Sequence, residues 1–96
     1  MENEQSQLVF TSVIVKEKNS LSALCLDVDV ASEGETIAEA KENLREAVSL
    51  YVESAIESNL PIIRPVSTSD NPLHTRSNDV KEVFKISIDV QVNAYV

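Results

Sequence analysis

The single histidine and the single cysteine are the first candidates for catalysis in this sequence. His74 lies in a polar stretch with no acid or nucleophile at a recognisable spacing, so we interpret it as an exposed loop residue. Cys25 stands between Leu24 and Leu26. Because a reactive thiolate needs basic neighbours, this cysteine is better explained as a small packed residue. The sequence therefore favours a protein that is not an enzyme and binds no cofactor.

Four acidic residues between positions 27 and 35 could together bind a metal ion. Asp27 and Asp29 are two positions apart and share one face of a strand, and Glu33 and Glu35 follow. Hard cations prefer carboxylate ligands, but the spacing is not that of an EF-hand loop. We interpret the cluster as a charged strand end and turn and predict no metal site. The alternative is a metal-dependent nuclease that uses Asp27, Asp29 and Glu33.

A further group of acidic residues has helical spacing. At 100° per residue, one face of a helix over residues 37–58 carries Glu39, Glu42, Glu46, Glu53 and Glu57. Residues 27–57 contain nine acids and only two bases, Lys41 and Arg45, which accounts for −7 of the total charge of −8. Such a face is either solvated or a docking surface for a basic partner. Both interpretations stay open on the spacing alone.

Length and composition are typical of one folded domain. The chain has 96 residues, 43% apolar and 25% charged, which predicts a single domain over residues 1–96. Eight basic against 16 acidic residues argue against direct nucleic-acid binding, because phosphates require a basic surface. No run of 18 apolar residues could span a membrane, and the N-terminus is too acidic for a signal peptide. Since a lone cysteine suits a reducing compartment, we expect a cytoplasmic protein.

Two strands are predicted before the helix. Residues 8–15 are mostly apolar and β-branched, and residues 21–30 alternate with a period of two. A turn at residues 16–20 joins them into a hairpin, with Leu24 on the core face. Residues 1–7 are polar, and we expect them to be frayed.

The helix has clear start and stop signals. Thr36 and Glu39 predict a capping box, in which the Thr hydroxyl accepts the amide of residue 39 and the Glu carboxylate reaches back to the N-cap amide. Asn59 is a suitable stop, with Pro61 just beyond it. Gly34, the only glycine, predicts a turn with a positive φ before the helix.

A long connection and a final strand complete the chain. Residues 61–79 hold all three prolines and show no periodicity, which indicates mobility or a binding role. Residues 84–96 alternate strictly. That strand would extend about 43 Å, against about 33 Å for the helix, so its end would pass beyond the layer that covers it. A bare apolar face and an unpaired edge invite a second copy of the chain. The predicted interface residues are Val90, Val92, Ala94, Tyr95 and Val96.

Together these elements predict an α/β fold of the α+β type, with one long helix packed on a mostly antiparallel sheet in two layers. A chain of this length hides only about two-thirds of its unfolded surface, so self-association would add useful burial. The predicted core consists of Leu24, Leu44, Ala47, Val48, Tyr51, Ile86 and Ile88.

The segment from Ala23 to Glu53 resembles the core motif of the HicB-like antitoxin family. The resemblance implies a strand–strand–strand–helix–strand domain with a partial ribonuclease-H-like sheet and no catalytic activity. It also implies that the chain binds and neutralises a small, basic, RNA-cleaving toxin of the HicA type. The matching positions are Ala23, Cys25, Asp29, Val30, Ser32, Gly34, Thr36, Glu39, Ala40, Asn43, Leu44, Glu46, Ala47, Leu50 and Tyr51.

The chain departs from the family pattern in three places. Leu26 stands where the family usually has proline, the first hairpin lacks its usual glycine, and the loop at 61–79 is longer than the motif requires. No ribbon-helix-helix or helix-turn-helix pattern follows the last strand, so we expect no C-terminal DNA-binding domain. The antitoxin role therefore competes with a second hypothesis, an oligomeric regulatory or structural protein of the same fold that has no toxin partner.

Overall fold

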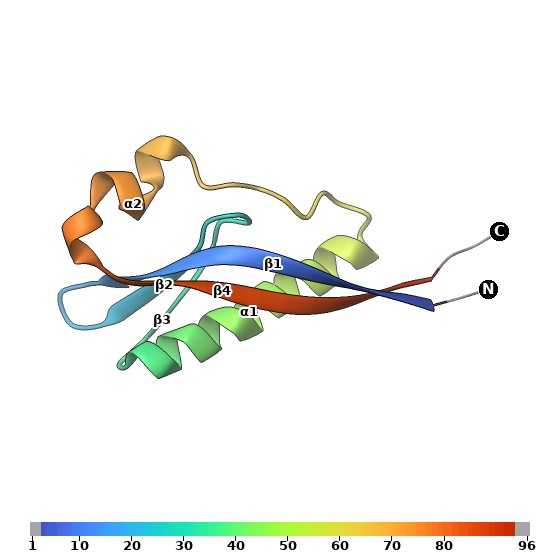
Figure 1. Ribbon diagram of the computed structural model, residues 1–96, viewed down its shortest axis with the longest axis horizontal. Helices are drawn as coiled ribbons and strands as arrows, with labels where there is room; N and C mark the ends of the chain where they lie inside the picture. Colours follow the sequence, from blue (N-terminus) through green and yellow to red (C-terminus); the bar gives the residue numbers. More distant parts are fainter. Residues whose placement is uncertain (1–2, 94–96) are drawn as a thin grey trace.

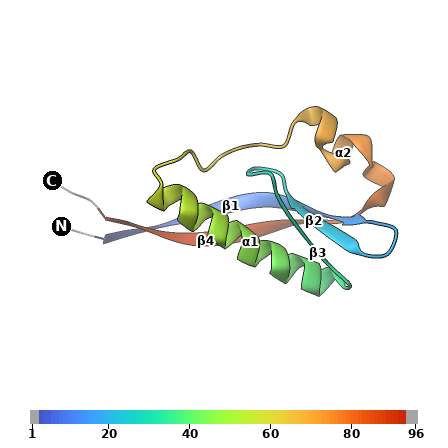
Figure 2. The same ribbon diagram turned by 180° about the vertical axis from the view of Figure 1, so that it is seen from behind.

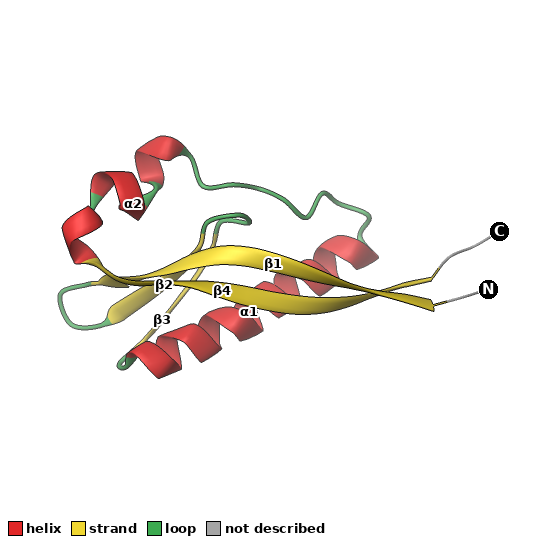
Figure 3. Ribbon diagram, viewed as in Figure 1, coloured by secondary structure: helices red, strands yellow, loops and turns green. Residues whose placement is uncertain are grey.

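The computed structural model describes residues 3–93 of the chain, and the side chains of residues 7–90. Four antiparallel strands in the order β3-β2-β1-β4 form one sheet, and the long helix packs on one face of it (Figure 1, Figure 3). This confirms the predicted α+β architecture. The elements in chain order are β1 (Asn3–Lys16), β2 (Leu21–Cys25), β3 (Val30–Gly34), α1 (Ile37–Glu57), η1 (Thr68–Asp70), α2 (Pro72–Thr75), η2 (Ser77–Asp79) and β4 (Val80–Asn93).

The first and last strands form the long axis of the sheet. β1 and β4 pair from Asn3 opposite Asn93 to Val15 opposite Val80. Both strands begin earlier than predicted, so residues 3–7 are paired strand residues rather than a frayed end. Figure 2 shows that this two-stranded ribbon continues past the C-terminal end of α1.

The single strand that alternation predicts over residues 21–30 is wrong, because the chain forms two strands there. The structure has the expected strand–strand–strand–helix–strand order, with three strands before α1. β2 ends before a turn at residues 26–29, and β3 returns antiparallel to it. Asp29 permits the turn with a φ of 52°, a left-handed conformation that Asp tolerates better than most residues. Val28 is 0% exposed, so its apolar side chain anchors the turn in the core. Residues 26–29 include neither glycine nor proline, so apolar and polar residues alternate across the turn as they do in a strand.

α1 ends one residue before the predicted boundary. The Thr36 hydroxyl accepts a hydrogen bond from the Glu39 amide at 3.0 Å, as a capping box requires. The Glu39 carboxylate, however, accepts from the amide of Glu35 and not from that of Thr36. At the other end Asn59 has a φ of 56°, and the next amide donates back to the carbonyl of Ala55. These are the features of a Schellman motif.

Gly34 has a different role from the one predicted. It ends β3 and does not have a positive φ. A Cβ atom at this position would lie 2.6 Å from the amide nitrogen of Ala40 in α1. The glycine is therefore needed because the end of β3 and the first turns of α1 approach closely.

The core lies between α1 and the sheet. Its fully buried members are Phe10, Ile14, Ala23, Cys25, Val28, Ala40, Leu44, Val48, Val52 and Ile86. Of the predicted core residues, Leu44, Val48 and Ile86 are buried, whereas Ala47, Tyr51 and Ile88 are half-buried. Leu24 was assigned to the wrong face: it is half-buried on the side opposite Ala23 and Cys25. The small side chains of Ala23 and Cys25 let α1 lie close to β2.

The connection between α1 and β4 covers the other face of the sheet at one end (Figure 1). Val13 and Val15 of β1 lie on the face of the sheet opposite α1, because side chains alternate along a strand. They are nevertheless only 0% and 2% exposed. The backbone amides of Arg64 and Val66 donate to carbonyls in the β2–β3 turn. Part of the sheet is therefore covered on both faces, which explains why β1 is apolar on both.

Arg76 fastens the far end of this connection to the β1–β2 hairpin. Its guanidinium donates to the Glu17 carboxylate at 2.7 Å, to the Lys16 carbonyl at 3.0 Å and to Asp79 at 3.2 Å. The pKa of Arg76 is raised, chiefly by the hydrogen bond with Glu17. The segment 61–79, predicted to lack structure, contains η1, α2 and η2.

Candidate partner-binding face

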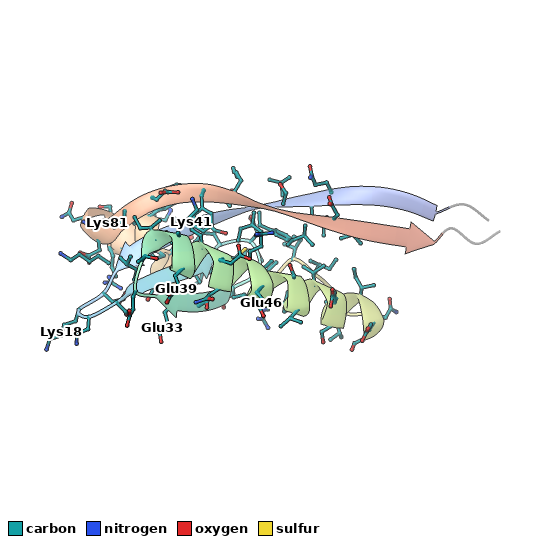
Figure 4. All side chains as sticks on the ribbon, turned by 90° about the horizontal axis from the view of Figure 1, so that it is seen from below. Lys18, Glu33, Glu39, Lys41, Glu46 and Lys81 are labelled. Atoms are coloured by element: carbon teal, nitrogen blue, oxygen red, sulfur yellow. The ribbon has the colours of Figure 1, made fainter. Side chains whose placement is uncertain are left out.

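The face of α1 that points away from the sheet carries the acidic residues. Ala40, Leu44 and Val48 face the sheet and are buried. On the opposite side the five predicted glutamates lie within about 60° of one another around the helix axis, and Figure 4 shows Glu39 and Glu46 on this side. All five are exposed: Glu39, Glu42, Glu46, Glu53 and Glu57. Their role in binding a partner stays a prediction.

The glutamates differ in how fully their charge is compensated. Glu42 forms an ion pair with Arg45 at 2.7 Å, and Glu39 accepts the Glu35 amide at 3.1 Å. No ion pair is formed by Glu46, Glu53 or Glu57 with any side chain that the structure describes. Among the described residues, the three glutamates without an ion pair or a hydrogen bond to the backbone thus lie in the C-terminal half of the face.

Two large apolar side chains lie on or beside this acidic half. Leu50 is 61% exposed and stands between Glu46 and Glu53 in the helical spacing. Ile56 is 45% exposed and stands beside Glu53 and Glu57. Exposed apolar residues framed by charge are typical of protein-binding surfaces, in which an apolar centre is surrounded by a polar rim. We name Glu46, Leu50, Glu53, Ile56 and Glu57 the acidic face.

A groove separates α1 from β4 on the helix-covered side of the sheet. It consists of two sections of about 490 and 530 Å³. Lys41 spans one section, donating to Glu82 at 2.5 Å and lying 4.9 Å from the centre of the Phe84 ring. The apolar lining comes from Val52 and Ile56 of α1 and from Phe84, Ile86, Ile88 and Val90 of β4.

The candidate catalytic residues are not brought together. His74 is exposed in α2, far along the chain from the buried Cys25, whose thiol pKa is raised mainly by burial. Asp27 accepts a hydrogen bond from the Thr11 amide at 2.6 Å, and Asp29 is exposed at its turn. Among the described residues, no group of three His, Cys, Asp or Glu is arranged to hold a metal ion.

The predicted self-association residues are only partly described. Val90 is half-buried in β4, and Val92 is paired with Glu4 in the backbone register. Ala94, Tyr95 and Val96 lie outside the described residues. The unpaired edge predicted for the last strand is present, because β4 pairs only with β1 among the described strands. The groove was not predicted, although the alternation of residues 84–90 indicates an apolar strand face.

Several residues of the segment 23–53 hold α1 against its neighbours. The Asn43 side-chain amide donates to the Glu33 carbonyl at 2.9 Å. The Tyr51 hydroxyl donates to the Ile62 carbonyl at 3.0 Å, which joins the helix to the connection that follows it. Gly34 permits the close approach of β3 and α1. Asn43, Tyr51 and Gly34 thus have packing and hydrogen-bonding roles within this chain.

Comparison with known proteins gives no family for this chain, since no protein-family model, no curated protein and no solved structure matches it. Within residues 3–93, no helix is long and apolar enough to cross a membrane.

Proposed function

We propose that this chain is a non-catalytic, antitoxin-type protein that binds and neutralises a small, basic, RNA-cleaving protein through its acidic face. The observation that carries the proposal is the exposed set of Glu46, Glu53 and Glu57 around Leu50, in a helix whose other side is fully occupied by the core. The resemblance of residues 23–53 to HicB-like antitoxins supports the same class of partner.

Charge and chemistry favour a nuclease as the partner. An RNA-cleaving protein must present a basic surface to phosphates, and an acidic protein that covers this surface competes directly with RNA. Opposite charge also speeds the encounter of the two proteins. The exposed Leu50 and Ile56 supply the apolar contact that charge alone does not provide.

The test compares two variants with the same change in net charge. Glu46→Lys/Glu53→Lys reverses the acidic face, whereas Glu35→Lys/Asp70→Lys reverses two exposed acids outside it. Tagged wild type and both variants are used to capture proteins from the native cell, and captured proteins are identified by mass spectrometry. We expect a small basic protein with wild type and the control variant, but not with the reversed acidic face.

The captured protein is then tested for RNA cleavage with and without this chain. We expect cleavage that added wild-type chain suppresses, with an association rate that falls as salt rises. A captured protein without ribonuclease activity, or equal capture by both variants, would contradict the proposal.

The second candidate, an oligomeric protein of this fold without a toxin partner, is favoured by one observation. β4 pairs with β1 on one side only and leaves a long backbone edge open. Absence of any basic partner together with a stable homo-oligomer would support this candidate over the first.

A further inference from the structure

β4 is the open edge of the sheet. In the order β3-β2-β1-β4 it pairs with β1 alone among the described strands. The other edge, β3, has five residues, whereas β4 has 14 and contains no proline. A long edge strand with unpaired N–H and C=O groups is a template for another strand.

We propose that two copies of this chain pair through β4, antiparallel, about a two-fold axis at Ser87. The pairing would join the two sheets into one continuous sheet, with both helices on the same face. This inference goes beyond the proposed toxin binding and does not depend on it, because the acidic face of α1 takes no part in the contact.

Backbone geometry restricts the register. In an antiparallel pair, two facing residues both point their N–H groups toward the partner strand or both point them away. This direction alternates along a strand, so in two identical strands an even-numbered residue faces an even-numbered one and an odd-numbered residue an odd-numbered one. The two-fold axis must therefore pass through a residue that faces its own copy. An axis at Ser87 pairs residues 81–93 of one copy with residues 93–81 of the other, which uses almost the whole of β4. An axis nearer either end would leave much of both edges unpaired.

The charges on the face opposite α1 select Ser87. Lys85 and Asp89 are both exposed. With the axis at Ser87, Lys85 of each copy faces Asp89 of the other copy, so two opposite-charge pairs form. An axis at Ile86 would place Asp89 opposite Val83, and an axis at Lys85 or Asp89 would bring like charges together. Opposite charges stabilise directly facing positions, and like charges destabilise them.

The helix-covered face is compatible with the same register. With the axis at Ser87, Ile86 faces Ile88 of the second copy and Phe84 faces Val90. Ile86 belongs to the buried core, and Phe84, Ile88 and Val90 are half-buried against it. Their pairing would continue the apolar lining of the groove across the axis. Val90, from the predicted interface, is included, and the centre of the contact lies at Ser87 rather than near residue 96.

Cross-linking tests the axis directly. Ser87→Cys in a Cys25→Ala background places two thiols opposite each other at the axis, within the distance that a disulfide spans. The matched control is Val83→Cys, because Val83 is 52% exposed on the same face but would face residue 91. We expect mild oxidation to cross-link most Ser87→Cys chains and few Val83→Cys chains. Equal cross-linking of the two variants, or none in either, would overturn the proposal.

Charge exchange tests the register in the native chain. We expect wild type to sediment at twice its 10.6 kDa mass at tens of micromolar. Lys85→Asp or Asp89→Lys alone should raise the dissociation constant of the dimer about tenfold, and the double exchange should restore it. A monomeric wild type, or a dimer unaffected by the single changes, would refute the pairing. A dimer that captures no basic protein would count against the proposed toxin binding alone.

Discussion

The backbone amide of Thr11 donates a hydrogen bond to the carboxylate of Asp27, with 2.6 Å between the two heavy atoms. The carbonyl of Thr11 in turn accepts the amide of Leu26 at 2.9 Å. β2 ends at Cys25, so these two bonds continue its pairing with β1 into the turn. The acidic residue that first looked like a metal-ligand candidate thus has a backbone partner.

Removing the Asp27 carboxylate should therefore destabilise the fold. Asp27→Ala leaves a partly buried amide without its acceptor, and we expect the free energy of unfolding to fall by about 1–3 kcal/mol in urea denaturation. Asp27→Asn keeps an acceptor oxygen and should cost less. Glu33→Ala, at an exposed carboxylate, is the control and should change stability by less than about 0.5 kcal/mol.

The buried side of α1 is tested by Leu44. This side chain is 0% exposed, and Leu44→Ala should lower the free energy of unfolding by about 2–5 kcal/mol. Leu50→Ala makes the same chemical change at a 61% exposed position and should have little effect on stability. Similar losses in both variants would mean that the wrong face of α1 has been assigned to the core.

The close approach at Gly34 predicts a penalty for the smallest possible side chain. In Gly34→Ala the new Cβ would meet backbone atoms of Ala40 at 2.6 Å, and backbone cannot rotate away as a side chain can. We expect a loss of about 1–3 kcal/mol, the cost typical of overpacking. Ser32→Ala, in the same strand, provides the comparison. A Gly34→Ala protein as stable as wild type would disprove the contact.

The end of α1 offers a change that should stabilise. Asn59 has a φ of 56°, where glycine carries no steric penalty and alanine carries about 1 kcal/mol. Thermal denaturation should give Asn59→Gly a melting temperature at or above that of wild type, and Asn59→Ala one that is lower. The reverse order would mean that the Schellman motif is absent in solution.

Cys25 predicts a dependence of stability on alkaline pH. Burial raises the pKa of its thiol above the ordinary value, so the folded chain holds this proton more tightly than the unfolded chain does. The resulting stabilisation is present below the unfolded pKa of about 8.5 and is lost as the pH rises toward the folded pKa. Between pH 8 and pH 10, wild type should lose more unfolding free energy than Cys25→Ala, by up to about 1.4 kcal/mol per pH unit. Equal slopes would show that Cys25 keeps its ordinary pKa.

Helix α1 could be predicted from sequence because its signals are local. Thr36 and Asn59 act on amides and carbonyls within a few residues, and the apolar spacing repeats over the length of the helix. Alternation alone missed the β2–β3 turn, because residues 26–29 contain neither glycine nor proline to mark it. The expected strand–strand–strand–helix–strand order does include this turn. Leu24 was assigned to the wrong face because alternation shows that two faces differ, but not which of them α1 covers.

The candidate site was predictable in composition but not in detail. Helical spacing placed the glutamates on one exposed face. It did not predict that Glu42 pairs with Arg45 or that Glu39 accepts the Glu35 amide, because these contacts depend on side-chain rotamers. Arg76 donates hydrogen bonds to Glu17 and Lys16, which precede it in the sequence by 59 and 60 positions. No local pattern encodes such contacts, and for this reason the segment 61–79 looked structureless.

The pairing of the first strand with the last also sets the speed at which this chain can fold. Thr11 and Lys85 are neighbours in the sheet although they are 74 positions apart in sequence. Bringing such distant segments together lowers the conformational entropy of the chain before the stabilising contacts between them have formed. The chain should consequently fold in milliseconds to seconds, more slowly than a helical bundle of equal length. Until β4 arrives, one edge of β1 is open to any other strand, so the interval before closure is when the newly made protein is most exposed to aggregation.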